Sequence, residues 1–457
     1  MKRIGMIAAS MLAFACAPLS AQDFAVTNAT VALGDGSEPI EGGTVVVREG
    51  RVVAAGSDVA IPTGVTAIDA GGGWVTPGLF ATVTTLGLWD VGAVDESNDT
   101  RANDAPFSAA LDAAPVVNPN SQHILIHRAA GITRAATTTL PSGSIFAGQG
   151  AIIDLDSDDR PVVEPRAFQM VTLGEQSARI AGGSRVAAHT LIRNALREAG
   201  SYGDAAQIPG MSSRARETRT GDEVRIDPRL SGRETERAGD VLLTRFDAAA
   251  LVPVVRGEQQ LYVAVDRAVD IRSALALKEE FPRLDLVLVG AAEGWLVADE
   301  IAAAGVPVIA EALTDLPERF EQLAATQSNV GRMMRAGVQV AIAASSGENP
   351  RNIPQAAGNL VALSRVPGAD GLRWGEAFAA ISSVPAAISG YEGEAGVLAP
   401  GATGDVVIWD GDPLEVGSVP VRVFIGGVEQ PLDNHQSRLK ERYRDLDETD
   451  LPKAYDR

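Results

Sequence analysis

Five polar residues stand where apolar, strand-like runs of the sequence end. Asp266 and Arg267 follow one run, Glu293 follows the next, and Thr85 and Ser345 end two others. The carboxyl ends of parallel strands meet at one edge of a sheet, and such sheets carry their binding sites there. The set therefore predicts a pocket that binds a small polar molecule without hydrolysing it.

A structural role for these residues is the alternative. Asp266 and Arg267 can form a local ion pair, and Glu293 can cap the helix expected to begin near Gly294, where the helix dipole favours negative charge. A nucleophilic mechanism is not supported, because no histidine or lysine is placed to deprotonate the threonine and serine hydroxyls of the set. Lys278 lies on an expected outer helix.

The histidines give a weaker signal. His123 and His127 lie four residues apart on one face of an expected helix, a spacing compatible with a metal pair. The glutamate that usually lies between such a pair is missing, and the segment maps to an outer helix, so we expect a surface or packing role. His189 and His435 are expected to be structural or solvated.

Residues 77–393 alternate strand-like and helical stretches, the pattern of a parallel sheet covered on both faces. The expected strands are 79–85, 132–138, 261–266, 285–290, 306–310 and 338–344. The expected helices are 121–130, 268–281, 294–304, 320–336 and 374–389. This pattern predicts an α/β fold, a (β/α)8 TIM-like barrel. Segments 86–119 and 201–240 interrupt it; the second is expected to be a surface loop, with a role as a lid left open.

Both chain ends carry short β-rich runs separated by turn residues. These runs are 25–33, 44–47, 52–55, 65–69, 405–410 and 421–425. The simplest assembly is a small composite β-sandwich domain from residues 22–76 and 394–430, beside a barrel at 77–393. The charged tail, 431–457, is expected to form a short surface helix with a frayed end.

Residues 1–21 have the layout of a secretory signal peptide, with Lys2 and Arg3 before an apolar run and a plausible cleavage site after Ala21. The run is too short to span a membrane in the mature protein, and no other segment is long and apolar enough, so we expect a periplasmic protein. A lipid anchor on Cys16 is the alternative, which Phe14 disfavours. Since the only cysteine lies in this signal, the mature chain would have no cysteine metal site.

The chain is acidic, with 39 basic and 59 acidic residues and a net charge of −20. Such a chain repels nucleic acid and anionic lipid, so small molecules or proteins are the expected partners. The glycine runs at 71–73 and 182–183 lack the strand-then-helix context of a phosphate-binding loop, and nucleotide binding is not expected.

Two motifs carry a family resemblance over nearly all of the mature chain. Residues 74–79, Trp-Val-Thr-Pro-Gly-Leu, lead into the first barrel strand, and residues 398–413 form a closing motif that contains Pro-Gly-Ala-Thr-Gly-Asp. In combination they resemble the amidohydrolase superfamily, in its exported imidazolonepropionase-like or dipeptidase-like branch. The resemblance implies a divalent ion, usually zinc, at the carboxyl ends of the barrel strands, and hydrolysis of an amide, a cyclic amide or a dipeptide.

The positions that hold the metal in that family carry other residues here. Its first strand has Asp-x-His-x-His, its fifth and sixth strands each have a histidine, and its eighth has an aspartate. The corresponding residues are Ala81, Val83 and Thr85 in the first strand, Ala264 in the fifth, Gly290 in the sixth and Ser345 in the eighth. Alternate residues on a strand share a face, so the first three would line the barrel interior. None is a usual ligand of a catalytic divalent ion.

We therefore predict an exported, amidohydrolase-like protein that has lost the metal centre, needs no cofactor and is catalytically impaired. It would bind a small polar ligand or a partner, as a homo-oligomer or paired with a catalytic paralogue. The competing hypothesis is an active hydrolase of C–N bonds that uses a divergent site.

Overall fold

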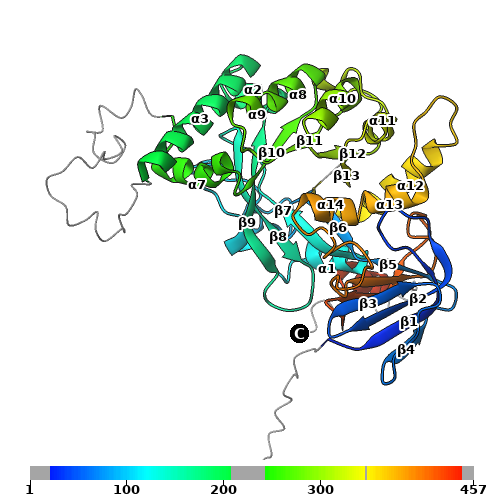
Figure 1. The fold of residues 1–457 in the computed structure, drawn as a ribbon. Helices are drawn as coiled ribbons and strands as arrows, with labels where there is room; N and C mark the ends of the chain where they lie inside the picture. Colours follow the sequence, from blue (N-terminus) through cyan, green and yellow to red (C-terminus); the bar gives the residue numbers. More distant parts are fainter. Residues whose placement is uncertain (1–20, 207–241, 345–346, 445–457) are drawn as a thin grey trace, which may run out of the picture.

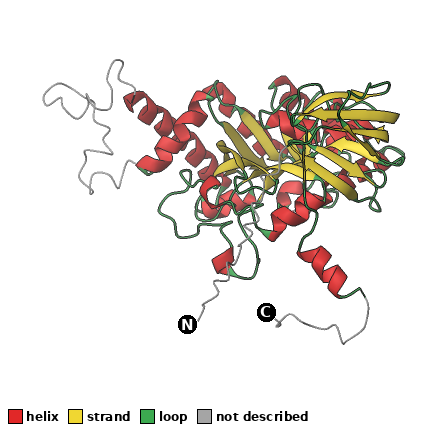
Figure 2. Ribbon diagram, turned by 90° about the horizontal axis from the view of Figure 1, so that it is seen from below, coloured by secondary structure: helices red, strands yellow, loops and turns green. Residues whose placement is uncertain are grey.

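The computed structural model describes residues 21–206, 242–344 and 347–444. The strands form two separate sheets, and the helices gather around one of them (Figures 1 and 2). Residues 1–20 of the predicted signal peptide, most of the 201–240 segment, Ser345 with Ser346, and the end of the tail lie outside the described residues.

One sheet is a nearly closed barrel of eight strands in the order β13-β12-β11-β10-β9-β8-β7-β6. Its strands are β6 Leu79–Thr84, β7 Ile132–Thr137, β8 Phe146–Asp154, β9 Val162–Thr172, β10 Gln260–Val265, β11 Leu286–Gly290, β12 Val308–Glu311 and β13 Val340–Ala343. The end strands β6 and β13 lie side by side without being paired by hydrogen bonds (Figure 1). The predicted α/β barrel is therefore confirmed.

Strand β8 departs from the predicted pattern of eight parallel strands. It runs antiparallel to both β7 and β9, and the other neighbouring pairs of this sheet are parallel. The connections on either side of β8 are too short to hold a crossover helix, so they form hairpins instead. The sequence patterns had revealed neither β8 nor β9.

Helices lie around the barrel, most of them against the outer face of its sheet. They are α1 Gln122–Ala129, α2 Glu175–Ile180, α3 Arg185–Ala206, α7 Arg245–Arg256, α8 Ala268–Leu275, α9 Leu277–Glu280, α10 Ala298–Ala303, α11 Asn329–Arg335, α12 Ile353–Leu363, α13 Trp374–Ala379, α14 Ser383–Ile388 and α15 His435–Arg442. Short 3₁₀ helices are η1 Asp95–Ser97, η2 Ala114–Val116, η3 Gly294–Val297, η4 Phe320–Gln322 and η5 Pro350–Asn352.

Four of the expected long helices are interrupted. In the segment 374–389, α13 ends at Ala379 and α14 begins at Ser383. Pro385 has no N–H to donate, so it is accommodated in the first turn of a new helix and not inside a continuous one. The segment 320–336 contains only η4 and α11, with an irregular stretch between them. None of the helices in the described residues is long and apolar enough to cross a membrane.

Two apolar layers hold the barrel together. The outer layer lies between the sheet and the helices and includes Leu79, Val263 and Ile271. The inner layer fills the barrel itself, where Phe168 and Tyr262 stack with ring centroids 4.2 Å apart. Successive strand residues enter the two layers alternately, as expected for strands covered on both faces.

The second sheet unites the two chain ends. Its path is β16-β15-β14-β5-β1-β2-β3, with β4 paired to β1. The strands are β1 Phe24–Val31, β2 Ile40–Arg48, β3 Arg51–Gly56, β4 Thr66–Asp69, β5 Trp74–Pro77, β14 Val406–Trp409, β15 Pro420–Ile425 and β16 Val428–Glu429. Phe24 and Phe424, from strands that are not neighbours in this path, stack at 4.2 Å. The predicted sandwich is thus one hydrogen-bonded sheet that curls around its own core.

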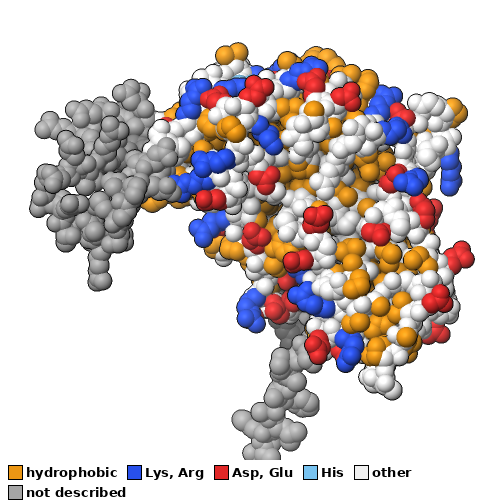
Figure 3. Space-filling model, viewed as in Figure 1, with side chains coloured by type: hydrophobic (Ala, Val, Ile, Leu, Met, Phe, Trp, Pro, Cys, Tyr) orange, Lys and Arg blue, Asp and Glu red, His pale blue; other side chains and the backbone are white. Residues whose placement is uncertain are grey.

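Charge on the surface is mixed. On the face shown in Figure 3, basic side chains lie among acidic ones and patches of hydrophobic side chains are exposed between them. The net negative charge of the chain is therefore not gathered into one acidic patch on that face. Interspersed charge of both signs is typical of a protein that stays soluble without a large single-sign field.

A buried ion pair joins the barrel to the terminal sheet. Arg134 of β7 donates from Nε to Oδ2 of Asp405 at 2.8 Å, and both side chains are buried. Asp405 also accepts from the N–H of Gly426, and its charge raises the pKa of Arg134. Loss of the arginine would leave a buried carboxylate without its cation, which is costly.

We expect Arg134→Ala to lower the free energy of unfolding by roughly 3–5 kcal/mol for that reason. Urea unfolding followed by tryptophan fluorescence measures the effect. Arg272→Ala is the matched control, because Arg272 pairs with Glu300 at the exposed surface and should cost less than about 1 kcal/mol. Equal costs for the two variants would contradict the structural role of the buried pair.

Candidate functional site

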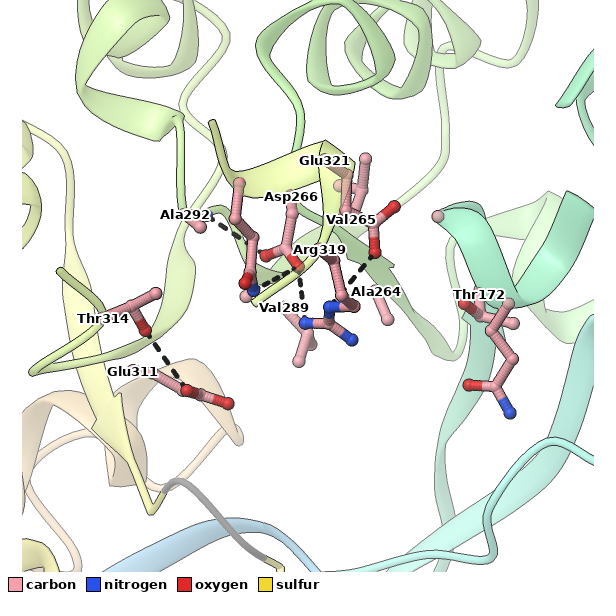
Figure 4. Close-up of a pocket in the computed structure, with 14 residues that line it drawn as sticks. Thr172, Ala264, Val265, Asp266, Val289, Ala292, Glu311, Thr314, Arg319 and Glu321 are labelled. Carbon is pink, nitrogen blue, oxygen red and sulfur yellow. Dashed lines mark hydrogen bonds and ion pairs between the residues drawn. The ribbon is translucent and has the colours of Figure 1, made fainter. Parts of the chain in front are cut away.

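A cavity of about 180 Å³ opens at the carboxyl ends of β9, β10, β11 and β12. Its lining residues are Thr172, Gly174, Gln176, Ala264, Val265, Asp266, Val289, Gly290, Ala292, Glu311, Thr314, Arg319, Glu321 and Gln322. Figure 4 shows Arg319 next to Asp266, with Glu321 on one side and the pair of Glu311 and Thr314 on the other. Barrel enzymes keep their sites at this end of the strands.

Asp266 is the most firmly held group in the cavity. Its Oδ1 accepts from the N–H of Ala292 at 3.2 Å, and its Oδ2 accepts from Arg319 at 3.0 Å and from Gln322 Nε2 at 3.1 Å. The residue is only 8% exposed. Burial raises the pKa of Asp266 despite these donors, because desolvation penalises the charged form.

Gly290 makes room for that carboxylate. A Cβ at this position would lie 2.5 Å from Asp266 Oδ1, and the backbone has a φ of +89°, which L side chains rarely adopt. The position expected to carry the sixth-strand histidine therefore has neither the space nor the backbone conformation for one. Asp266 reaches into the region where such a side chain would begin.

Two further carboxylates have raised pKa values in the same cavity. Burial raises the pKa of Glu311, and the nearby charge of Asp266 adds to the effect. Burial also raises the pKa of Glu321, which accepts from the N–H of Glu175 at 2.6 Å and lies within 3.7 Å of the Arg319 guanidinium. Titratable groups shifted together in one cavity are a mark of functional sites.

A second, larger cavity of about 780 Å³ adjoins the first. The two share Glu311, Thr314, Arg319 and Gln322. The larger one extends along the segment after β12 toward α12. Its other lining residues are Ala312, Leu313, Asp315, Leu316, Pro317, Glu318, Ala343, Ala344, Asn352, Gln355 and Ala356. The two cavities together provide a polar end and a partly apolar extension.

The predicted pocket residues do not all meet in this cavity. Asp266 lines it, together with the degenerate positions Ala264 and Gly290. Thr85, Arg267 and Glu293 are absent from its lining. Thr85 is buried elsewhere and accepts a hydrogen bond from Trp89 Nε1 at 3.1 Å. Ser345 lies outside the described residues.

The structure contradicts two structural roles expected from the sequence, the ion pair of Asp266 with Arg267 and the helix cap by Glu293. Arg267 does not pair with Asp266, because its guanidinium contacts Asp270 at 2.9 Å while Asp266 pairs with Arg319. Glu293 makes no side-chain cap for the 3₁₀ helix that follows it. Its Oε2 accepts instead from the N–H of Ala268, at the start of α8, at 3.0 Å.

The first barrel strand does not alternate as expected. Ala81 packs in the outer apolar layer rather than the interior, whereas Val83 contacts the inner layer. The register of β6 against β7 shifts between Ala81 and Thr84. Val83 has a φ of +51°, an outlier for a β-branched residue. The irregularity explains why Ala81 and Val83 face opposite sides.

None of the histidines lines either of the two cavities. All four histidines of the chain are in described helices: His123 and His127 in α1, His189 in α3 and His435 in α15. His127 is buried in α1, and burial lowers its pKa to about 4. Across the described ranges, no three His, Cys, Asp or Glu side chains are grouped so that they could hold a metal ion.

Four site residues were missed by the sequence patterns. Glu311 ends β12 one residue beyond the expected strand, so the rule that selected Asp266 would also have selected it. Arg319, Glu321 and Gln322 come from the segment between β12 and α11, which was expected to become helical at 320. They are more than fifty residues away from Asp266 in sequence, and no local pattern connects them.

Comparison with known proteins agrees with this architecture. The model of the amidohydrolase family matches residues 291–427. An imidazolonepropionase from Ralstonia nicotianae is 27% identical over 397 residues, which covers 82% of this chain and 88% of its own. The crystal structure of an amidohydrolase from Thermotoga maritima aligns with a TM-score of 0.74 at 22% identity, over 89% of this chain and 99% of that one. These matches support a relationship of this chain to the amidohydrolase superfamily.

The region that matches the family model begins directly after Gly290. It contains the cavity residues Glu311, Arg319 and Gln322, but not the degenerate positions Val83 and Ala264. The family match therefore rests on the second half of the barrel and on the return of the chain to the terminal sheet.

We expect Gly290→Ala to destabilise the protein more than Gly337→Ala, by at least about 1 kcal/mol, because only position 290 adds a clash to the backbone strain. Gly337 is the matched control, since it has the same φ of +89° and no heavy atom lies within 4 Å of the place that its Cβ would take. Denaturant unfolding of both variants gives the comparison. Equal destabilisation would show that the Asp266 carboxylate does not occupy this space.

We expect Glu311→Gln to stabilise the protein at neutral pH by about 0.5–1 kcal/mol. Because the pKa of Glu311 is raised in the folded state, this carboxyl group ionises at a lower pH in the unfolded chain, near its ordinary pKa of about 4.3. As pH rises above that value, the free energy of unfolding therefore falls. The difference from wild type should vanish below about pH 4. Urea titrations across this range measure it, with the exposed Glu279→Gln of α9 as control. A variant less stable than wild type at neutral pH would contradict the assignment.

Proposed function

We propose that this amidohydrolase-superfamily protein binds a small polar ligand at the barrel mouth and does not perform the metal-dependent hydrolysis of its family. One observation carries the proposal. The expected ligand positions Val83, Ala264 and Gly290 offer no donor atom from their side chains, while a cavity lined by carboxylates lies beside two of them. A site that keeps its cavity but lacks its metal donors is suited to binding.

The residues present do not fit a catalytic zinc ion. Such a site needs about three protein ligands, mostly imidazole nitrogens and carboxylates, with one open position for water. Asp266 is nearest to the expected positions, but its oxygens already accept from Ala292, Arg319 and Gln322. Coordination would require these hydrogen bonds to break, and no histidine lines either cavity to complete the set.

The chemistry of hydrolysis also lacks its usual base. The family uses an aspartate of the eighth strand to take a proton from the attacking water, and this chain has Ser345 at that position. The carboxylates of the cavity come from the end of β12 and from the segments after β10 and β12, and each has a donor or a cation beside it. They can position a ligand through hydrogen bonds and charge, which is what binding requires.

We expect the purified mature protein to contain less than about 0.1 equivalent of zinc, because three of the expected ligand positions have no donor side chain. Plasma mass spectrometry after dialysis measures the metal content. Hydrolysis of dipeptides, cyclic amides and imidazolonepropionate, the last suggested by the Ralstonia relative, should stay at the uncatalysed rate with or without added zinc.

An active metal-dependent hydrolase of the superfamily, carried through the same purification and dialysis, is the control for metal loss. Near-stoichiometric zinc together with a hydrolytic activity that a chelator removes would overturn the proposal and favour an active enzyme with a divergent site. Activity without zinc would equally overturn the binding-only function.

A further inference from the structure

The two adjoining cavities are strongly unbalanced in charge. Their lining residues include five carboxylates and one guanidinium. The carboxylates are those of Asp266, Glu311, Asp315, Glu318 and Glu321. The guanidinium of Arg319 is already engaged by Asp266 at 3.0 Å and approached by Glu321 at 3.7 Å. Glu321 is also paired with Arg185 of α3 at 3.4 Å, a residue outside the two linings. The carboxylates of Glu311, Asp315 and Glu318 have no ion pair among the described residues, and charge complementarity favours a cationic ligand beside them.

Two hydrogen-bond acceptors that line both cavities accept fewer hydrogen bonds than they can. Gln322 is 4% exposed, and its Nε2 donates to Asp266, but its Oε1 has no donor among the described residues. Glu311 accepts one side-chain hydrogen bond within the described part of the chain, from the Thr314 hydroxyl to its Oε2 at 3.3 Å. A buried acceptor without a donor costs free energy, and a ligand that brings N–H groups would recover it.

An apolar wall continues from these acceptors. Leu313, Leu316 and Pro317 line the larger cavity next to Glu311. Leu316 is 77% exposed, an unusual position for a large apolar side chain beside a polar cavity. Covering it with an apolar part of a ligand would remove that surface from water, at about 25 cal/mol per Å² of apolar area.

We infer that the ligand is an organic cation, an amine, amidine or guanidine carrying an apolar chain or ring. Its N–H groups donate to Glu311 and to Oε1 of Gln322, and its apolar part lies against Leu313 and Leu316. This inference rests on the proposed binding function and adds the chemical class of the ligand. A bare metal ion is a poorer occupant, because the acceptors among the described residues are not grouped as a coordination site.

The raised pKa of Glu311 is consistent with a bound organic cation. Burial and the charge of Asp266 raise the pKa of Glu311, with Glu318 adding to the rise and Arg319 and Thr314 opposing it. A bound organic cation would stabilise the ionised form of this carboxyl group. Binding should therefore release protons in the pH range between the ordinary and the raised pKa.

Benzamidine, benzamide and benzoate form a matched set of probes, because they share a phenyl ring and differ in the charge of its substituent. Isothermal titration of the full mature chain should detect benzamidine with a Kd of about 1 mM or tighter. Benzamide should bind at least about tenfold more weakly, since it lacks the charge-assisted hydrogen bonds. Benzoate binding as strong as that of benzamidine, or no benzamidine binding at all, overturns the inference.

Variants locate the site. Glu311→Gln should weaken benzamidine binding at least about tenfold, since it removes one charge-assisted hydrogen bond. Glu279→Gln, an equal charge change on the exposed face of α9, should leave the affinity unchanged. Leu316→Ser should weaken binding of benzamidine more than that of methylguanidinium, which has no ring to cover. Circular dichroism and the melting temperature establish that each variant is folded. Unchanged affinity in folded Glu311→Gln contradicts the inference.

The result of the benzamidine series can be told apart from the result of the test of the proposed function. Metal content and hydrolysis decide whether the protein is a binding member of its family, whichever probe binds. The benzamidine series decides only the charge class of the ligand. Preferential binding of benzoate by a zinc-free, inactive protein would reject the cation and leave the binding function standing.

Discussion

The barrel mouth depends on how the buried carboxylate of Asp266 is balanced. An ionised carboxylate at this depth is costly unless donors or a cation satisfy it. Here the N–H of Ala292, the amide of Gln322 and the guanidinium of Arg319 converge on it. Two of these partners belong to the segment after β12, so the same contacts fold that segment over the strand ends. The cavity takes its shape from this arrangement.

The space that the Asp266 carboxylate occupies also restricts which residue can end the neighbouring strand, β11. Gly290 has no side chain because the Asp266 oxygen occupies the space a Cβ would need. The next residue, Ala291, also has a positive φ, and it donates through its N–H to Val265 at 2.8 Å. The chain after β11 thus turns closely around the end of β10. A histidine at position 290 is incompatible with this turn, and an arginine from a distant segment supplies the positive charge beside the carboxylate.

Below the mouth, the barrel is stabilised by apolar packing. Phe168 and Tyr262 stack in the interior, and Val83 joins that layer through a left-handed backbone conformation. Such a conformation costs about 1–3 kcal/mol for a residue that is not glycine, so the surrounding packing must impose it. The interior is accordingly a filled core, and the two cavities lie at the strand ends.

Sequence patterns predicted the parts of this structure that depend on local rules. The apolar runs located six of the eight barrel strands, and the polar residue after one run, Asp266, does line the cavity. Strand β8 was missed because Gly148 and Gly150 dilute its apolar pattern; Gly150 is required where the Phe168 ring packs against it. Strand β9 contains Pro165 and Arg166, which also obscure the pattern. Arg319 and Gln322 could not be predicted because only tertiary folding brings them to Asp266.

The proposed function requires that Asp266 and its hydrogen-bond partners lie where side-chain donors for a metal would otherwise be. Anomalous X-ray diffraction at the zinc edge, from crystals of the protein equilibrated with excess zinc, tests this requirement most directly. The account predicts no anomalous peak at the carboxyl ends of β6, β10, β11 and β12, and unbroken hydrogen bonds from Ala292, Arg319 and Gln322 to Asp266. An ordered zinc ion there, coordinated by Asp266 or Glu311, would contradict it.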